Sequence, residues 1–117
     1  MTRRPDIRMT PAEVAAFLAG KRRAVVGTLD AQGAPAGEPV DFAYDAGVAT
    51  VTLARDAAAA RNLARDPRVV CSLEEFPSYG EIRGVTLHGR AVPAGELRFR
   101  IEAERIESFD FRKMPKG

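Results

Sequence analysis

Few side chains in this 117-residue sequence offer chemistry on their own: there is one histidine, one cysteine and no tryptophan. The chain therefore holds no His/Cys cluster with the spacing of a zinc site, and we expect no metal. No set of Ser, His and Asp stands out as a hydrolytic triad, and no Gly-x-Gly-x-x-Gly segment follows a strand and opens a helix. The single cysteine, Cys71, excludes an internal disulfide and is expected to be a small buried hydrophobe, because it lies in the apolar run 69–73.

Long hydrophobic runs and a strong charge of one sign are also lacking. The longest apolar run is far shorter than the roughly 18 residues that suggest a membrane span, and no apolar segment of a secretory signal follows the basic start. The formal net charge is only +2, and the arginines are spread along the chain. Spread charge is typical of a solvated surface and does not indicate nucleic-acid binding. We therefore expect a cytoplasmic protein with no membrane and no nucleic-acid partner.

What is present is the composition of one globular domain spanning residues 1–117. Hydrophobic residues make up 45% and charged residues 29%, which are globular proportions. Residues 1–9 are expected to form a flexible arm. A short amphipathic helix is predicted from Thr10, an N-cap that forms a capping box with Glu13. Its end is predicted at Gly20, in a left-handed conformation.

Strand patterns dominate the rest of the chain. Turn signals at residues 30–33 and 45–47 separate β-rich runs and predict two successive hairpins. Gly84 and Gly89 predict a bend or bulge in the fifth strand. Strands are predicted at 23–29, 37–44, 48–53, 68–74, 82–92 and 97–102, with a turn at 93–95 and a separate final segment at 106–114. Six short strands fit a closed barrel better than an open sheet, because closure removes exposed edges. The predicted fold class is mainly β, a six-stranded antiparallel β-barrel with two short helices.

The second predicted helix, residues 57–65, starts directly after the third strand. Alanine is the best helix former, and Asp56 is the expected cap. The free N–H groups and positive dipole end of such a helix start favour phosphate. Arg55 stands at this entry and Arg61 lies one to two turns in, and guanidinium groups can hold phosphate oxygens in pairs. The alternative is that both arginines are ordinary surface charges.

Other polar residues give weaker indications. His88 is expected to face opposite to Leu87, on the surface or toward a partner subunit, with a haem ligand or an acid–base group as the alternative. Glu74 and Glu75 are neighbours on a strand, so they point to opposite faces and are not expected to act as an acid–base pair. No catalytic residue is assigned.

The order of these segments resembles a known family. The sequence reads PVDFAY at 39–44, RNLARDPRV at 61–69 and RGVTLHGRA at 83–91. In this order and spacing it is similar to the pyridoxamine-5'-phosphate-oxidase-like family, in particular to its small flavin- and deazaflavin-dependent oxidoreductases. The likeness runs from about residue 10 to residue 114.

This resemblance implies a split barrel of the FMN-binding type that forms a homodimer with cofactor clefts between the subunits. The ring system would lie along the second strand, and the phosphate side would rest on the third strand and the following helix. The closing segment of the chain would face the cofactor or substrate. The expected cofactor-binding residues are Pro39, Val40, Asp41, Phe42, Thr52, Leu53, Arg55, Arg61 and Arg112.

Two cofactor-binding functions remain open at this point, beside a structural dimer that holds no cofactor. The first is an oxidoreductase that uses FMN, or alternatively a deazaflavin coenzyme, to pass a hydride or electrons to a small organic substrate. The second is a carrier or sensor that binds a flavin, or less favourably haem, without turnover. Residues 57–59 favour the second function, because members of the family often have Ser, Arg or Lys there, which help to hold phosphate. Relatives also usually insert a helical segment where residues 92–97 cross directly.

Overall fold

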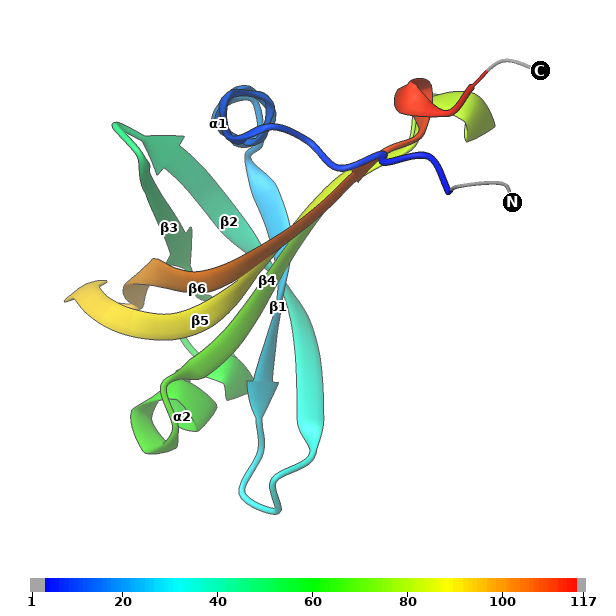
Figure 1. The fold of residues 1–117 in the computed structure, drawn as a ribbon. Coiled ribbons are helices and arrows are strands. Elements are labelled where there is room, and N and C mark those ends of the chain that lie inside the picture. Colours follow the sequence, from blue (N-terminus) through cyan, green and yellow to red (C-terminus); the bar gives the residue numbers. More distant parts are fainter. Residues whose placement is uncertain (1–3, 116–117) are drawn as a thin grey trace.

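Short β-rich segments separated by turns pair into six antiparallel strands in the computed structural model, which describes residues 4–115. The strands are β1 (Arg23–Leu29), β2 (Pro35–Asp45), β3 (Val48–Thr52), β4 (Arg68–Glu75), β5 (Arg83–Gly95) and β6 (Arg98–Asp110). The helices are α1 (Pro11–Ala19) and α2 (Ala58–Arg65), with 3₁₀ turns η1 (Tyr79–Glu81) and η2 (Phe111–Lys113). The strands close into a barrel in the order β1-β2-β3-β6-β5-β4 (Figure 1). The predicted mainly β fold, a six-stranded antiparallel barrel with two short helices, is confirmed.

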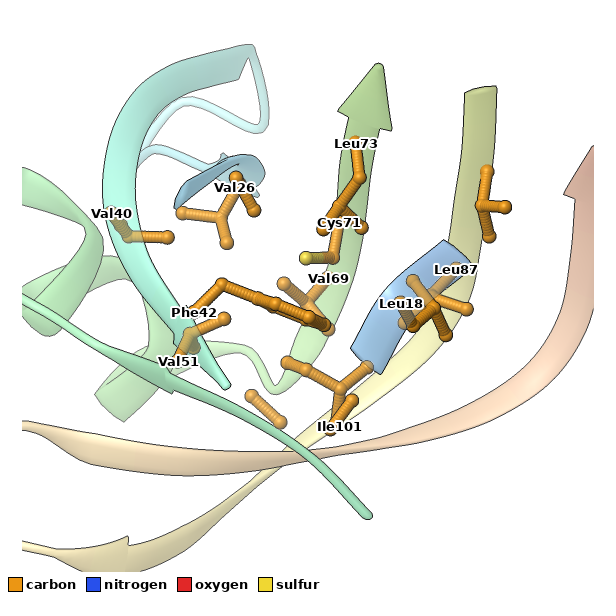
Figure 2. Packing of buried hydrophobic residues seen from close by; sticks show 14 of the residues in the cluster. Leu18, Val26, Val40, Phe42, Val51, Val69, Cys71, Leu73, Leu87 and Ile101 are labelled. Atoms are coloured by element: carbon orange, nitrogen blue, oxygen red, sulfur yellow. The ribbon is translucent and has the colours of Figure 1, made fainter. Parts of the chain in front are cut away.

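Side chains that alternate along the strands fill the barrel interior. Val26, Val51 and Cys71 are completely buried, and Figure 2 shows them gathered with Phe42 of β2 and Leu18 of α1. Burial of apolar surface contributes roughly 25 cal/mol per Å², so this cluster is the main source of stability. The prediction for Cys71 is confirmed, and burial raises the pKa of its thiol to about 12.

Helix α1 begins as predicted but ends differently. The N–H of Glu13 donates to Oγ1 of Thr10 at 3.2 Å, and Oε1 of Glu13 accepts the N–H of Thr10 at 2.8 Å, which completes the capping box. Gly20 has φ −90° and ψ 0°, so the predicted left-handed conformation is wrong. Its N–H donates to the carbonyl of Phe17. The chain thus leaves the helix through a right-handed turn that needs no positive φ.

The last two strands are longer than the sequence pattern indicates. β5 continues through the predicted turn at 93–95, and β6 runs to Asp110 instead of ending at residue 102. The separate segment predicted at 106–114 is therefore wrong, because its first part belongs to β6. The sequence pattern does not indicate this part of the strand. From residue 102 to residue 107 every side chain is exposed, so buried and exposed residues do not alternate there.

A glycine allows the long ribbon to bend. The register between β5 and β6 shifts between His88 and Gly89, and a Cβ atom at Gly89 would lie 1.9 Å from the carbonyl oxygen of Glu102. No other residue leaves room for that close approach of two backbones. The predicted bend or bulge at Gly89 is confirmed.

Beyond the barrel, the ribbon of β5 and β6 projects together with both ends of the described chain (Figure 1). Of the predicted arm, residues 1–3 lie outside the described residues. The carbonyl of Ile7 accepts the N–H of Asp110 at 2.8 Å, and the N–H of Met9 donates to a serine hydroxyl of β6 at 2.9 Å. Residues 7–9 therefore lie along β6. Within residues 4–115, no helix is long and apolar enough to cross a membrane.

Candidate functional site

The strand expected to carry the ring system divides its side chains between two faces. Val40 and Phe42 are 3% and 5% exposed and point into the core (Figure 2), whereas Pro39 and Asp41 are exposed on the outer face. This follows from the two-residue alternation of a strand. A ligand on the outer face would thus meet the side chains of Pro39 and Asp41, while Val40 and Phe42 would support the strand from inside.

The end of β3 lies beside this outer face. Thr52 is exposed and is paired in register with Asp41 on one side and Arg98 on the other. Asp41 accepts a hydrogen bond from Nη1 of Arg23 at 2.5 Å, so its carboxylate is held along the outer surface. Leu53, the next residue after β3, is buried and donates its N–H to a backbone carbonyl at 2.8 Å. The structure therefore brings Asp41 and Thr52 together and turns Leu53 inward.

The start of α2 is capped by a residue that the sequence analysis did not single out. The predicted cap Asp56 is wrong: the N-cap is Ala57, which makes no side-chain cap, because a turn between Ala54 and Ala57 moves the helix start one residue on. Instead, Oε1 of Glu38 on β2 accepts the N–H of Ala59 at 2.6 Å. The Glu38 carboxylate thus accepts a hydrogen bond from a backbone N–H group that was expected to bind phosphate.

The signal for Glu38 was present in the alternation of β2. Glu38 shares the inward-facing parity of Val40 and Phe42, and it is paired in register with the buried Val26. A glutamate on an inward-facing row needs a hydrogen-bond donor close by. The alternation predicts that Glu38 needs a donor, but it does not identify the Ala59 N–H as that donor.

The two arginines expected to hold phosphate are both exposed at this place. Nη1 of Arg55 pairs with Oε1 of Glu96 at 3.0 Å, and the two side chains are 79% and 76% exposed. Arg61 lies on the exposed side of α2. We call the residues 52–61, together with Glu38 and Glu96, the α2 corner. It holds two guanidinium groups, of Arg55 and Arg61, and three carboxylates, of Glu38, Asp56 and Glu96.

Helix α2 is fixed to the barrel by a buried polar pair. Nδ2 of Asn62 donates to Oγ1 of Thr28 at 3.0 Å, and the two residues are 5% and 3% exposed. Ala59 and Leu63 of α2 are buried beside this pair. The contact holds α2 against β1, close to the first residues of β2, and from there Glu38 reaches the helix N-terminus.

Arg112 lies at the opposite end of the chain's long ribbon. Its guanidinium group holds the buried carboxylate of Asp110 at 2.8 Å, and this hydrogen bond lowers the pKa of Asp110. Figure 1 shows η2 and α2 at opposite ends of the β5–β6 ribbon. Within one chain, the structure therefore does not bring Arg112 together with Arg55 and Arg61.

Arg112 lines a small cleft with a volume of about 310 Å³ beside α1. In it, Glu75 pairs with Arg83 and, at 3.8 Å, with Nζ of Lys21. The hydrogen bond from Arg83 is the main cause that lowers the pKa of Glu75. Lys21 and Arg83 also line this cleft. The sequence analysis did not single them out, because they are far apart along the chain and no local motif joins them.

A larger groove of about 1090 Å³ lies between α1, the start of β3 and the middle of β6. Val48 and Ile106 are 40% and 50% exposed on its walls. Neither this groove nor the small cleft is lined by Arg55 or Arg61. In the single chain, the α2 corner is thus separate from both cavities.

His88 faces outward from β5, opposite to Leu87, as the strand alternation predicts. Its Nε2 lies 2.5 Å from Oε1 of Glu107, and this hydrogen bond, followed by the charge of Arg105, lowers the pKa of Glu107. Among residues 4–115 there is no group of three or more side chains that could hold a metal ion.

The closed six-stranded barrel, with a helix following β3 and a long final ribbon, defines the class of small split-barrel proteins. The family model described as pyridoxamine 5'-phosphate oxidase matches residues 10–110, which is most of the chain. The chain therefore belongs to the pyridoxamine 5'-phosphate oxidase family, as the resemblance predicted.

Solved structures of the same fold agree with this membership. A conserved hypothetical protein from Mycobacterium tuberculosis is 26% identical with a TM-score of 0.82, over 100% of this chain and 96% of that one. An FAD binding protein from Mycobacterium smegmatis is 11% identical with a TM-score of 0.72, over 90% of this chain and 99% of that one. A heme binding protein from the same organism is 19% identical with a TM-score of 0.68, over 92% of this chain and 61% of that one. No curated protein sequence matches the chain significantly.

Proposed function

We propose that this protein binds a flavin-type cofactor and acts as an oxidoreductase toward a small organic substrate. The observation that carries the proposal is the family match over residues 10–110. Within residues 4–115 the protein has no group of side chains that could ligate a metal ion. When bound, such a cofactor itself supplies the hydride or electron transfer, and the protein positions it.

The ring system fits the outer face of β2 and β3. Pro39 and Thr52 offer small exposed side chains, and the carboxylate of Asp41 is hydrogen-bonded to Arg23 on the neighbouring strand. Pro39 is also paired in register with Val25, which is 49% exposed. A planar, partly apolar ring needs such a surface, and the neighbouring Asp41 carboxylate can accept a hydrogen bond from a ring N–H group.

Arg55 and Arg61 are the residues that would attract the anionic side chain of the cofactor. Exposed ion pairs such as that of Arg55 with Glu96 contribute little, about 0–1 kcal/mol. Arg55 can therefore exchange its partner for a phosphate group at small cost. The proposed cofactor is FMN or a related flavin, with a deazaflavin coenzyme as the alternative.

A homodimer is part of the proposal. Val25 and Val70 are 49% and 36% exposed on neighbouring strands of the barrel, and Phe76 and Tyr79 are 66% and 80% exposed near its projecting end. Exposed apolar groups gathered on one protein commonly mark an interface. In the proposed homodimer, Arg112 of the second copy lies near a cofactor held by the first, as the family resemblance implies, although the two regions are far apart within one chain.

The proposal is tested by adding riboflavin, FMN, FAD, a deazaflavin coenzyme and haem separately to the cofactor-free protein. Binding is measured by absorbance and fluorescence, and the oligomeric state by light scattering. We expect a dimer that binds at least one flavin or deazaflavin. The Arg55→Ala/Arg61→Ala protein should bind FMN about tenfold or more weakly, because it loses two charge-assisted hydrogen bonds. Riboflavin, which has no phosphate, should be affected little.

The matched control is Arg100→Ala/Arg105→Ala, which removes the same charge from β6. It should bind FMN like the original protein. If no flavin or deazaflavin binds, or if both double variants weaken FMN equally, the cofactor assignment to the α2 corner is refuted.

Cofactor binding without turnover is the second candidate, and the FAD binding and heme binding proteins of the same fold favour it. The two are separated by reducing the bound flavin and mixing it with a quinone acceptor. An oxidoreductase should transfer electrons faster than the free flavin does, whereas a carrier should slow the transfer. A haem Soret band that disappears in His88→Ala would instead assign the protein to haem binding.

A further inference from the structure

The N-terminus of α2 is occupied from inside the molecule. Helix N-termini carry unpaired N–H groups and the positive end of the helix dipole, and both attract anions. Here Oε1 of Glu38 accepts the N–H of Ala59 at 2.6 Å. The carboxylate thus satisfies a donor and is itself stabilised by the helix.

Two strong constraints keep Glu38 in this position. Its backbone is paired with Val26 of β1 in the continuous ladder between β1 and β2, so the residue cannot move along the sheet. Helix α2 is held by the buried hydrogen bond between Asn62 and Thr28. The contact between Glu38 and Ala59 therefore joins two fixed elements, strand β2 and helix α2.

The first turn of α2 offers no competing group. Residues 57–59 are all alanine, and the helix has no side-chain cap. A phosphate at these N–H groups would meet the Glu38 carboxylate at short range, and residues 57–59 offer no hydroxyl or cation to offset the repulsion, since Arg55 and Arg61 are exposed on the solvent side. Like charges at such distances repel strongly where water is partly excluded.

We propose that Glu38 is a specificity-determining residue of the cofactor site. It keeps a phosphate monoester away from the N–H groups of α2 and leaves only Arg55 and Arg61 to hold it, so the site gains little from the phosphate of FMN and accepts the uncharged side chain of riboflavin at least as well. This inference rests on the proposed flavin binding. It adds that the site discriminates between flavins by the charge at α2.

The test compares riboflavin with FMN in the original protein and in Glu38→Gln, by fluorescence titration at fixed ionic strength. Glutamine keeps an oxygen that can accept the Ala59 N–H, so α2 should remain folded, which circular dichroism checks. The original protein should bind riboflavin at least as tightly as FMN. Glu38→Gln should strengthen FMN binding by about tenfold, since one negative charge is removed beside the phosphate, and should change riboflavin binding less than about threefold.

The matched control is Glu81→Gln, which removes the same charge from η1 at the far end of the ribbon. It also keeps an oxygen that can accept the hydrogen bond from the Ser78 hydroxyl. It should change the affinity for neither flavin. A general charge effect would appear in both variants, whereas selection by Glu38 appears only in Glu38→Gln.

The outcomes separate this inference from the function on which it rests. If the original protein binds FMN more tightly than riboflavin, or if Glu38→Gln leaves the ratio of the two affinities unchanged, flavin binding stands and the role of Glu38 is refuted. If neither flavin binds to either protein, flavin binding and the role of Glu38 both fail. The comparison of riboflavin with FMN in the original protein needs no variant, so it tests the role of Glu38 even if Glu38→Gln folds poorly.

Discussion

The hydrogen bond between Asn62 and Thr28 is the contact whose loss should most clearly loosen α2 from the barrel. Both side chains are almost fully buried, at 5% and 3% exposure, and Nδ2 of Asn62 donates to Oγ1 of Thr28 at 3.0 Å. Thr28→Val keeps the shape of the side chain but removes the acceptor. The buried amide of Asn62 is then unsatisfied, which costs about 1–3 kcal/mol. We expect Thr28→Val to lower the free energy of unfolding by that amount.

Removing both partners should cost less than the sum of the single changes. Asn62→Leu alone leaves the Thr28 hydroxyl buried without its donor, and its cost should again be about 1–3 kcal/mol. In the double variant both positions are apolar and nothing polar is left unpaired, so the coupling energy should be about 1–2 kcal/mol. The assay is urea unfolding followed by far-ultraviolet circular dichroism. Additive single effects would show that the pair does not stabilise α2 as the structure indicates.

Three further predictions concern other parts of the chain. Because burial raises the pKa of Cys71 to about 12, the thiol should not react with a disulfide reagent at pH 8 until the protein is unfolded; rapid labelling of the folded protein would contradict its position in the core. Glu13 has its pKa lowered to about 2, first by the hydrogen bond from Lys113. A lowered pKa means that this contact stabilises the fold above the ordinary glutamate pKa and is lost as the pH falls toward 2. The midpoint of thermal unfolding of the original protein should therefore fall more steeply over this range than that of Glu13→Gln, and identical pH profiles would refute the contact. Asp66, whose pKa is lowered to about 2 by hydrogen bonds from Arg68, should behave in the same way, with Asp66→Asn as the variant to compare.

Local sequence chemistry was sufficient for most of the barrel. The capping box at Thr10 and Glu13 and the turns between the first three strands each depend on residues close together in the chain, and the bend of β5 is marked by a glycine, although its cause is the approach of Glu102 on β6. Such signals are readable because the physics that produces them is local. The long end of β6 was not readable, because its stability comes from pairing with β5 and not from a buried face of its own.

The candidate site required information that no local pattern holds. Strand alternation alone separates Pro39 and Asp41 from Val40 and Phe42, and this division could have been predicted. The cap of α2 could not be predicted from residues 56–60, because its acceptor comes from Glu38, some twenty residues earlier. Arg112 is placed by the path of the β5–β6 ribbon, and whether it reaches a cofactor depends on a second copy of the chain.

The balance of charges at the α2 corner is the physical point on which the choice of cofactor depends. In the proposed site, Arg55 and Arg61 would attract an anion from the solvent side, whereas Glu38 would repel one from the helix N-terminus on the barrel side. These opposed effects act at different places, so they predict opposite changes for one ligand: loss of the arginines weakens FMN binding, and loss of the Glu38 charge strengthens it. Riboflavin should be almost indifferent to both. A corner that was merely an ordinary charged surface would respond to neither change, and a phosphate site of the usual kind would respond only to the arginines.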